Sequence, residues 1–308
     1  MAVETVEPTK LPIHPTAKEI DSRFRQEVLS PWPRVGITTI IVLVVALLTY
    51  TWGIDGTNAE PAELVEGIPN IINFGVRLFP PDFAVKEFDA VDVPLVKYFV
   101  VAESLRVMSI PEAIPAIIET FQMAIIGTTL AVVASIPFGL LAARNTSPHP
   151  SIYQGTRMIL NFNRAVPEII WALIFVAAVG LGPFAGVMAL AIGGIGSLSK
   201  LFAEAIESID PQQVLSIKAT GANNLLSFAF GVVPQAAPLV ASYSLLNFEH
   251  NVRAASILGI VGAGGIGFIL NKYLALFQYQ KLMGALILLI IMVTIIDRLS
   301  DRVRKRLI

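Results

Sequence analysis

The chain has 308 residues, of which 55% are hydrophobic and 15% are charged, with a net charge of −1 and no cysteine. Its mean hydropathy of +0.70 lies well above that of ordinary soluble domains, which favours a membrane protein over a soluble enzyme. Disulfides and thiolate metal sites are excluded, the three histidines are too scattered for a metal cage, and nothing in the charge balance predicts a nucleic-acid partner.

The first predicted element is a membrane-spanning helix over residues 35–52, a run without charged side chains. About 20 apolar residues span a hydrocarbon core of about 30 Å, so the run is close to the length that one crossing needs. It follows a polar leader, residues 1–34, which is too long to precede the apolar region of a cleavable signal peptide. We expect the leader to be cytoplasmic and the helix to act as a signal anchor.

Residues 53–112 form the next predicted segment and carry ten acidic residues against four basic ones. Because basic residues concentrate in cytoplasmic loops, we expect this segment on the outer, periplasmic or extracellular side. Within it, residues 61–79 have apolar side chains at helical spacing on one face. This pattern predicts either a helix in the membrane interface or a loop packed on the outer rim of the protein.

The predicted membrane core covers residues 113–297. Its apolar runs are residues 120–143, 169–199, 234–270 and 282–296. The run 169–199 is broken at Gly180-Leu181-Gly182-Pro183, which predicts two short helices joined by a tight turn. The run 234–270 contains only three charged or titratable groups of note and is expected to form one span. The sequence therefore predicts an all-α polytopic membrane protein with about six transmembrane helices, a five-span core preceded by an N-terminal extra helix.

Basic residues set the predicted orientation. They cluster in the leader, in a loop over residues 144–164 and in a tail over residues 298–308, and cytoplasmic loops are the ones rich in Lys and Arg. Both termini are therefore predicted to be cytoplasmic, which an even number of spans allows. The same topology places the polar loop over residues 201–234 in the cytoplasm.

This cytoplasmic loop has the pattern of two short helices. Asp210 is placed to cap the first helix, Pro211 takes its first position, and a glutamine of the Gln212-Gln213 pair is placed to return a hydrogen bond. Gly221 then ends the helix, and the second helix is expected to end at Pro234. Such a pair is either a rigid knob that fits a cleft on a cytoplasmic partner or a connector between two spans.

The loop resembles the coupling motif of importer-type ATP-binding cassette (ABC) permeases. The shared features are the Lys-Ala-Thr-Gly run that ends at Gly221 and the apolar-Pro close at Pro234, whereas the family's Glu-Ala-Ala positions are Leu215, Ser216 and Ile217 here. The resemblance implies that the loop docks on an ATPase. The implied coupling residues are Asp210, Pro211, Gln212, Lys218, Ala219, Thr220, Gly221, Ala222 and Pro234.

Residues 248–267 are similar to the signature of phosphonate and phosphite permeases of the type I importers, and residues 79–83 and 164–168 add to the resemblance. It implies a permease subunit in a prokaryotic plasma membrane. Its partners would be a second permease copy in a homodimer, two cytoplasmic ATPases and an external substrate-binding protein. No G-x-x-x-x-G-K-[ST] motif occurs in the sequence, so ATP and Mg would be used by the ATPase, and this chain would be no enzyme and bind no cofactor.

Four residues of the run 234–270 are candidates for the transport pathway: Asn247, Glu249, Asn251 and Arg253. Glu249 and Arg253 are four residues apart, so they share a helix face and can pair. Ionisable groups inside a membrane face a bundle interior, a partner or a water-filled path. Either Arg253 attracts an oxyanion in transit while Glu249 holds it in place, or the two form a structural clamp between helices.

The glycine-rich run from residue 262 to residue 267 satisfies the pattern G-x-G-x-x-G. A dinucleotide fold is excluded by context, because no acidic residue follows about 20 positions on and no alternation of strands and helices surrounds the motif. Small residues here predict close helix packing or a narrow gate instead. The residues concerned are Gly262, Gly264, Gly265 and Gly267.

Other functions fit the sequence less well. An ion-gradient-driven secondary transporter would favour inverted repeats, which are not visible. A membrane-embedded enzyme would need paired acids or a histidine cluster, but the consecutive residues Glu249 and His250 point in different directions on a helix. The cargo stays open among phosphonate, phosphite, phosphate and, more distantly, methionine.

Overall fold

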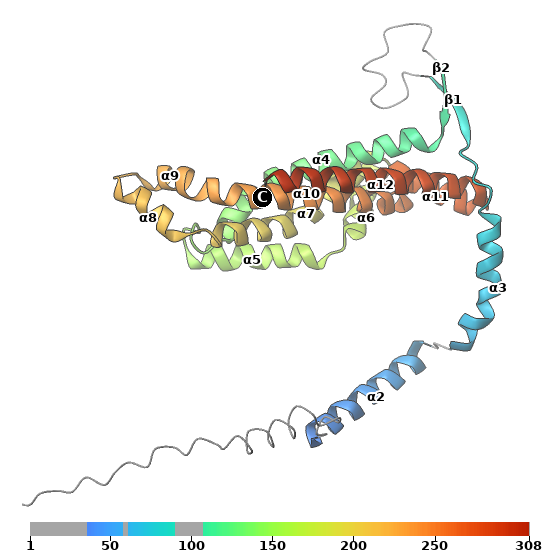
Figure 1. The fold of residues 1–308 in the computed structure, drawn as a ribbon, viewed down its shortest axis with the longest axis horizontal. Coiled ribbons are helices and arrows are strands. Elements are labelled where there is room, and N and C mark those ends of the chain that lie inside the picture. The colour runs from blue at the N-terminus through green and yellow to red at the C-terminus, as the bar shows by residue number, and fades with distance from the viewer. Residues whose placement is uncertain (1–35, 58–60, 90–106, 308) are drawn as a thin grey trace, which may run out of the picture. The chain divides into compact units, whose positions relative to one another are not determined.

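A computed structural model describes residues 36–57, 61–89 and 107–307 of the chain. These residues are helical apart from turns and one two-stranded hairpin (Figure 1). The predicted all-α class therefore holds for the described residues, with the hairpin as its exception. The chain separates into two units, residues 1–71 and 72–308.

The first unit contains α2 (Ile37–Thr57), a helix of 21 residues without a buried side chain. A helix that is apolar on all sides is stable in lipid, so α2 matches the predicted first span, although it ends at Thr57 rather than at residue 52. The amphipathic α3 (Pro61–Arg77) begins in this unit. A helix thus forms where a helix or a packed loop was expected, and its position in the membrane interface stays a prediction.

The second unit is built around three long helices, α4 (Ala113–Ala142), α7 (Pro183–Glu207) and α10 (Val233–Leu258). They pack against one another along the bundle (Figure 1). Small residues allow the close approach of α4 and α7, because a Cβ added at Gly127 would lie 2.8 Å from the Cβ of Leu190.

In the sequence, α4 and α7 are separated by a bent pair of helices, α5 (Pro150–Ala165) and α6 (Glu168–Val179), whose axes differ by 85°. The expectation of a loop over residues 144–164 is therefore wrong. The charged Arg157 made the segment look like a solvated loop, but its guanidinium lies 3.1 Å from the Glu207 carboxylate of α7. This ion pair allows a helix with charged residues to pack on the bundle.

The turn predicted at residues 180–183 is present between α6 and α7. Gly180 and Gly182 have φ of 93° and 141°, a conformation that favours glycine, and Pro183 takes a first-turn position of α7. The helix α7 is longer than expected, with 25 residues. Five helices of the described residues are long and apolar enough to cross a membrane, or six when the bent pair counts as one, in agreement with the predicted number.

The run 234–270 does not form one helix. The helix α10 ends at Leu258, and after a 3-10 turn and a short break the chain continues as a separate helix, α11 (Gly265–Ala275). Gly262 and Gly264 have φ of 88° and 81°, which residues in a continuous helix do not adopt. The last helix, α12 (Tyr279–Leu307), continues through most of the basic tail.

The outer segment includes a hairpin of β1 (Val85–Asp89) and β2 (Val107–Pro111), with Val85 opposite Pro111. Glu112, which follows β2 directly, ties the hairpin to α11. Its carboxylate lies 2.6 Å from Lys272 Nζ and 2.9 Å from Lys86 Nζ, and it accepts a bond of 2.7 Å from the Tyr273 hydroxyl. Burial acts to raise the pKa of Glu112, but these three hydrogen bonds outweigh burial and lower the pKa to about 2.

Candidate passage and coupling site

The loop predicted to couple to an ATPase begins with α8 (Pro211–Ala219). As predicted, Asp210 caps this helix, with its Oδ1 accepting a bond of 2.9 Å from the Gln212 N–H. The predicted return bond from a glutamine of the Gln212-Gln213 pair is wrong. The Asp210 N–H donates instead to Gln235 Oε1, at 2.9 Å, so the start of α8 is fastened to the first turns of α10.

The predicted stop at Gly221 is present, with φ of 86°. After it, Asn223 caps the short α9 (Asn224–Ser227), and a π-helical turn, Phe228–Val232, leads directly into α10. The second helix of the loop therefore does not end at Pro234. A proline in the first turn of a helix needs no N–H, so the chain can pass through Pro234 and continue as α10.

The outer surface of the loop is open to a partner. Val214 and Ile217 turn inward onto Gly231, while α8 has no buried residue and Leu215 is 56% exposed. Figure 1 shows α8 and α9 at one end of the bundle. The predicted coupling residues on this surface that are exposed are Asp210, Pro211, Gln212, Lys218, Ala219, Thr220, Gly221 and Pro234, and Ala222 is half-buried.

The pathway candidates lie near the middle of the bundle. Their position can be measured along α4, which has 30 residues. Ala124 of α4 packs in one cluster with Val252 and Ile296, and it lies about 17 Å along the helix from Ala113 at about 1.5 Å per residue. The charged groups beside Val252 and Ile296 are therefore far from both ends of the roughly 45 Å helix.

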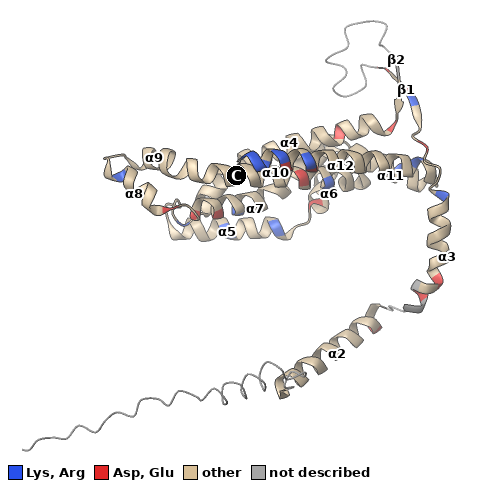
Figure 2. Ribbon diagram, in the orientation of Figure 1, with Lys and Arg blue, Asp and Glu red and all other residues tan. Residues whose placement is uncertain are grey.

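Glu249 and Arg253 do pair, as predicted, with Arg253 Nη2 lying 3.8 Å from Glu249 Oε2. Both have closer partners on α12, which the sequence reasoning missed. Arg304 Nη2 lies 2.5 Å from Glu249 Oε1, and Arg253 Nη1 lies 3.4 Å from Asp297. Figure 2 marks Lys and Arg positions in blue on the ribbon of α12 toward its C-terminal end. The cluster thus fastens α10 to α12.

The two asparagines lie on other sides of α10. Asn251 is only 1% exposed, and its amide donates a bond of 2.9 Å to Thr128 Oγ1 of α4. Asn247 faces Gly194 of α7, where a Cβ would lie 3.3 Å from its side-chain amide. The structure therefore brings Asn247 and Asn251 into the packing of α4, α7 and α10 rather than beside Arg253.

A second ionic contact joins the bent pair to α10. His250 Nε2 lies 2.8 Å from Glu168 Oε1, with side chains 57% and 30% exposed. Glu168 opens α6 while Arg164 belongs to α5, so the four-residue spacing between them does not lie on one helix. The Cγ methylene of Glu168 packs on Gly193 of α7, where an added Cβ would lie 2.7 Å from it.

The glycine run forms the junction of α10 and α11. A Cβ on Gly259 would lie 2.5 Å from the Gly264 carbonyl oxygen, and one on Gly267 would collide with the Ser256 carbonyl oxygen. Gly262 and Gly265 have positive φ, like Gly264. The junction is held on α4, where Thr120 Oγ1 accepts a bond of 2.8 Å from the Ile266 N–H, and the Glu119 carboxylate accepts a backbone bond from Gly265.

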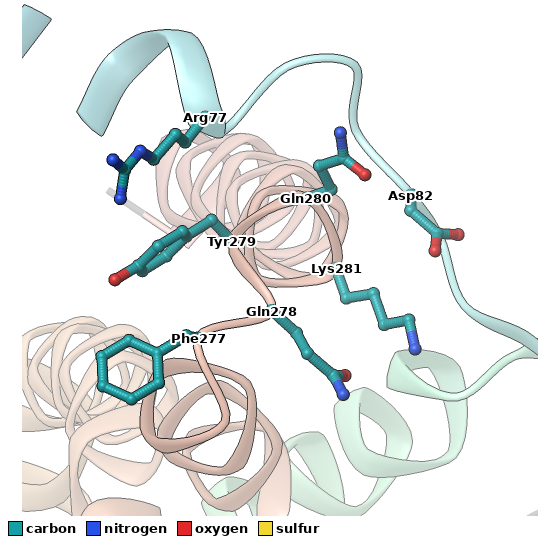
Figure 3. A pocket seen from close by; sticks show the side chains of 7 residues that line it. All are labelled: Arg77, Asp82, Phe277, Gln278, Tyr279, Gln280 and Lys281. Atoms are coloured by element: carbon teal, nitrogen blue, oxygen red, sulfur yellow. The ribbon is translucent and has the colours of Figure 1, made fainter. Parts of the chain in front are cut away.

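A cavity of about 380 Å³ lies where α11 meets α12. It is lined by Arg77, Asp82, Phe277, Gln278, Tyr279, Gln280 and Lys281. Figure 3 shows that these side chains point in different directions and do not converge on one position. The cavity therefore has polar walls without a built ligand site.

Comparison with known proteins agrees with this geometry. The model of the family described as binding-protein-dependent transport system inner membrane component matches residues 135–308. The phosphite transport system permease protein PtxC of Stutzerimonas stutzeri is 36% identical over 89% of this chain and 90% of its own length. The phosphate-import permease protein PhnE of Mycolicibacterium smegmatis is 43% identical over 62% of this chain and 36% of its own.

Among solved structures, an inward-facing conformation of the MetNI methionine ABC transporter contains a chain with the same fold. The TM-score is 0.56 at 21% identity, with 64% of this chain and 96% of that chain covered. The described helices of this chain thus have the arrangement of an ABC importer's membrane subunit. Since the family model covers more than half of the sequence, this chain belongs to the binding-protein-dependent transport system inner membrane components.

Proposed function

We propose that this chain is the permease subunit of an ATP-driven importer whose cargo is a phosphorus oxyanion, phosphite or a phosphonate in the first place. The observation that carries the proposal is the link between α8 and α10. The exposed α8 is fastened to α10 by the Asp210–Gln235 bond, and α10 carries the titratable His250 and the cation Arg253 at mid-bundle. A push on α8 therefore reaches the helix that an anion would pass.

The proposed assembly has two permease subunits, two cytoplasmic ATPases and an external binding protein that delivers the anion. The ATPases use ATP and Mg, and both termini of this chain face the cytoplasm with them. ATP binding closes the ATPases on α8 and α9. It favours the access state of the passage in which the whole transporter binds nucleotide more tightly. The permease itself needs no catalytic residue.

Arg253 is the first proposed contact for the anion. It is 47% exposed and lies 3.4 Å from Asp297, so its guanidinium is held in place while part of it stays accessible. The names of the similar proteins support phosphite as the cargo, and phosphate is the second candidate because one similar permease is named for phosphate import.

The test is reconstitution of the tagged chain with its ATPase and binding protein in proteoliposomes. We expect the ATPase to co-purify, and uptake of phosphite, methylphosphonate or inorganic phosphate to require internal ATP on the ATPase side. Uptake that persists without ATP on an ion gradient alone, from a chain that captures no ATPase, would contradict the proposal. Uptake of phosphate alone would select the second cargo.

A further inference from the structure

One exposed face of α10 differs from the exposed face of α4. Its exposed residues follow one another at helical spacing, continue into the 3-10 turn at Ile260, and include a histidine and an arginine: Leu246, His250, Arg253, Ile257 and Ile260. The exposed face of α4 has the same depth but no charge: Phe121, Ile125, Ile126, Leu130, Val133 and Ile136. The two faces therefore suit different surroundings, lipid for α4 and water or protein for α10.

The depth of the two faces in the bundle bears on what can surround them. Val252, between His250 and Arg253, packs beside Ala124, about 17 Å along a helix of roughly 45 Å. An ionisable side chain at such a depth costs several kcal/mol when it faces lipid. We take the α10 face to line the passage of the assembled transporter, because a face that carries His250 and Arg253 suits water or a partner better than lipid.

On this face His250 is held in one orientation. Its Nε2 lies 2.8 Å from Glu168 Oε1, so Nε2 carries a proton and donates to the carboxylate. Within the described part of the chain, its Nδ1 has no hydrogen-bond partner. Arg253 is three residues further on and shares the face. As an imidazolium, His250 would present an Nδ1–H donor next to the Arg253 guanidinium.

We propose that His250 is a second contact for the transported oxyanion, with its Nδ1–H and the Arg253 guanidinium binding different oxygens of one tetrahedral phosphorus anion. Glu168 and Asp297 are positioning residues that orient the two donors. The inference rests on the proposed function and names the contact within its passage.

The carboxylates also keep the contact weak. Glu168 faces His250, while Glu249 and Asp297 face Arg253, so each cation is partly neutralised before an anion arrives. A passage must bind its cargo favourably enough to admit it and weakly enough to release it. Charge-assisted bonds from two half-neutralised donors meet both needs.

Two substitutions distinguish a His250 that contacts the anion from a His250 that only holds α6 and α10 together. The amide nitrogen of a glutamine occupies about the place of Nε2, so His250→Gln keeps the Glu168 bond and loses the Nδ1 donor. The amide nitrogen of an asparagine lies near the place of Nδ1, so His250→Asn keeps that donor and loses the Glu168 bond. His149→Asn is the matched control, because it also removes an imidazole but retains an oxygen that can accept the Ser151 N–H bond.

The measurement is the amount of phosphite delivered per ATP hydrolysed in proteoliposomes that contain the whole transporter. We expect His250→Gln to lower this ratio about tenfold or more, as loss of one charge-assisted bond does, with ATP hydrolysis within about twofold of the original. His250→Arg, which restores a fixed cation, should recover part of the transport, and His149→Asn should leave the ratio unchanged.

The inference is overturned if His250→Gln transports normally while His250→Asn fails, since His250 would then only clamp the bent pair to α10. It is equally overturned if His250→Arg assembles and hydrolyses ATP but transports no better than His250→Gln. Neither outcome touches the proposed function, which fails only when the unsubstituted chain captures no ATPase or transports without ATP.

Discussion

At the scale of single residues, Glu249 holds more of the passage together than its spacing from Arg253 suggested. Its side chain is 10% exposed and faces Arg304 on one side and Arg253 on the other. Removing the charge leaves Arg304, itself 24% exposed, without its shortest ionic contact. Removing one partner of a largely buried ion pair is strongly destabilising, and the remaining contact of Arg304 is with the exposed Asp301.

We therefore expect Glu249→Gln to lower the stability of the purified chain by about 3 kcal/mol, seen as a lower midpoint of thermal unfolding in detergent. Asp301→Asn is the matched control, because Asp301 contacts the same Arg304 at 3.3 Å but is 60% exposed. Exposed pairs contribute less than about 1 kcal/mol. Equal losses for the two variants would contradict a buried clamp at Glu249.

The residues of this cluster show how far sequence reasoning reached. The Glu249–Arg253 contact follows from helical spacing, which is a local property. Arg304 and Asp297 are 55 and 44 residues away from their partners, and only the packing of α12 on α10 brings them near. Arg304 lies in a segment whose basic residues predicted a solvated tail, so its sequence context pointed away from the bundle.

At the scale of elements, the junction of α10 and α11 depends on two backbones that touch. The Cα of Gly267 lies 2.6 Å from the place of a Cβ on Gly259, and a Cβ on Gly267 would meet the Ser256 carbonyl. Backbone atoms cannot swing aside as a flexible side chain can. Opening the junction would also strain the Ile266–Thr120 bond to α4.

We expect Gly267→Ala to destabilise the chain by about 2 kcal/mol or more, as overpacking of tight sites does, and to reduce transport in parallel. Gly155→Ala is the control, because Gly155 lies inside α5 with nothing within 4 Å of its added Cβ. That variant should be up to about 1 kcal/mol more stable. The measurement is the midpoint of thermal unfolding of both variants. A Gly267→Ala variant as stable as the original chain would show that the junction is loosely packed.

Element prediction succeeded where the signal was local and failed where it was tertiary. The cap at Asp210, the stop at Gly221 and the break before Pro183 come from residues that act within one turn. Hydropathy gave a single run over 234–270, because glycine and alanine are apolar in either a helix or a turn. The break at Gly262 is stabilised by tertiary contacts, because Thr120 and Gly182 bond to the turn.

At the scale of the whole molecule, the charged face of α10 requires a partner surface. One chain leaves His250 and Arg253 about half exposed, and such side chains are costly where they face lipid. Two permease subunits that turn these faces toward one another would enclose a wet passage. The uncharged face of α4 would then remain on the lipid side of the assembly.

Single cysteines can test this arrangement without background, because the chain contains no cysteine of its own. We expect Leu246→Cys, on the charged face, to be joined to a second copy by a short bifunctional thiol reagent in native membranes, giving a dimer band in denaturing electrophoresis. Val133→Cys, 61% exposed on the α4 face, should give none. Dimers from Val133→Cys alone would place the passage on the other side of the bundle. Joining to a different permease chain, and never to a second copy, would show a heterodimer.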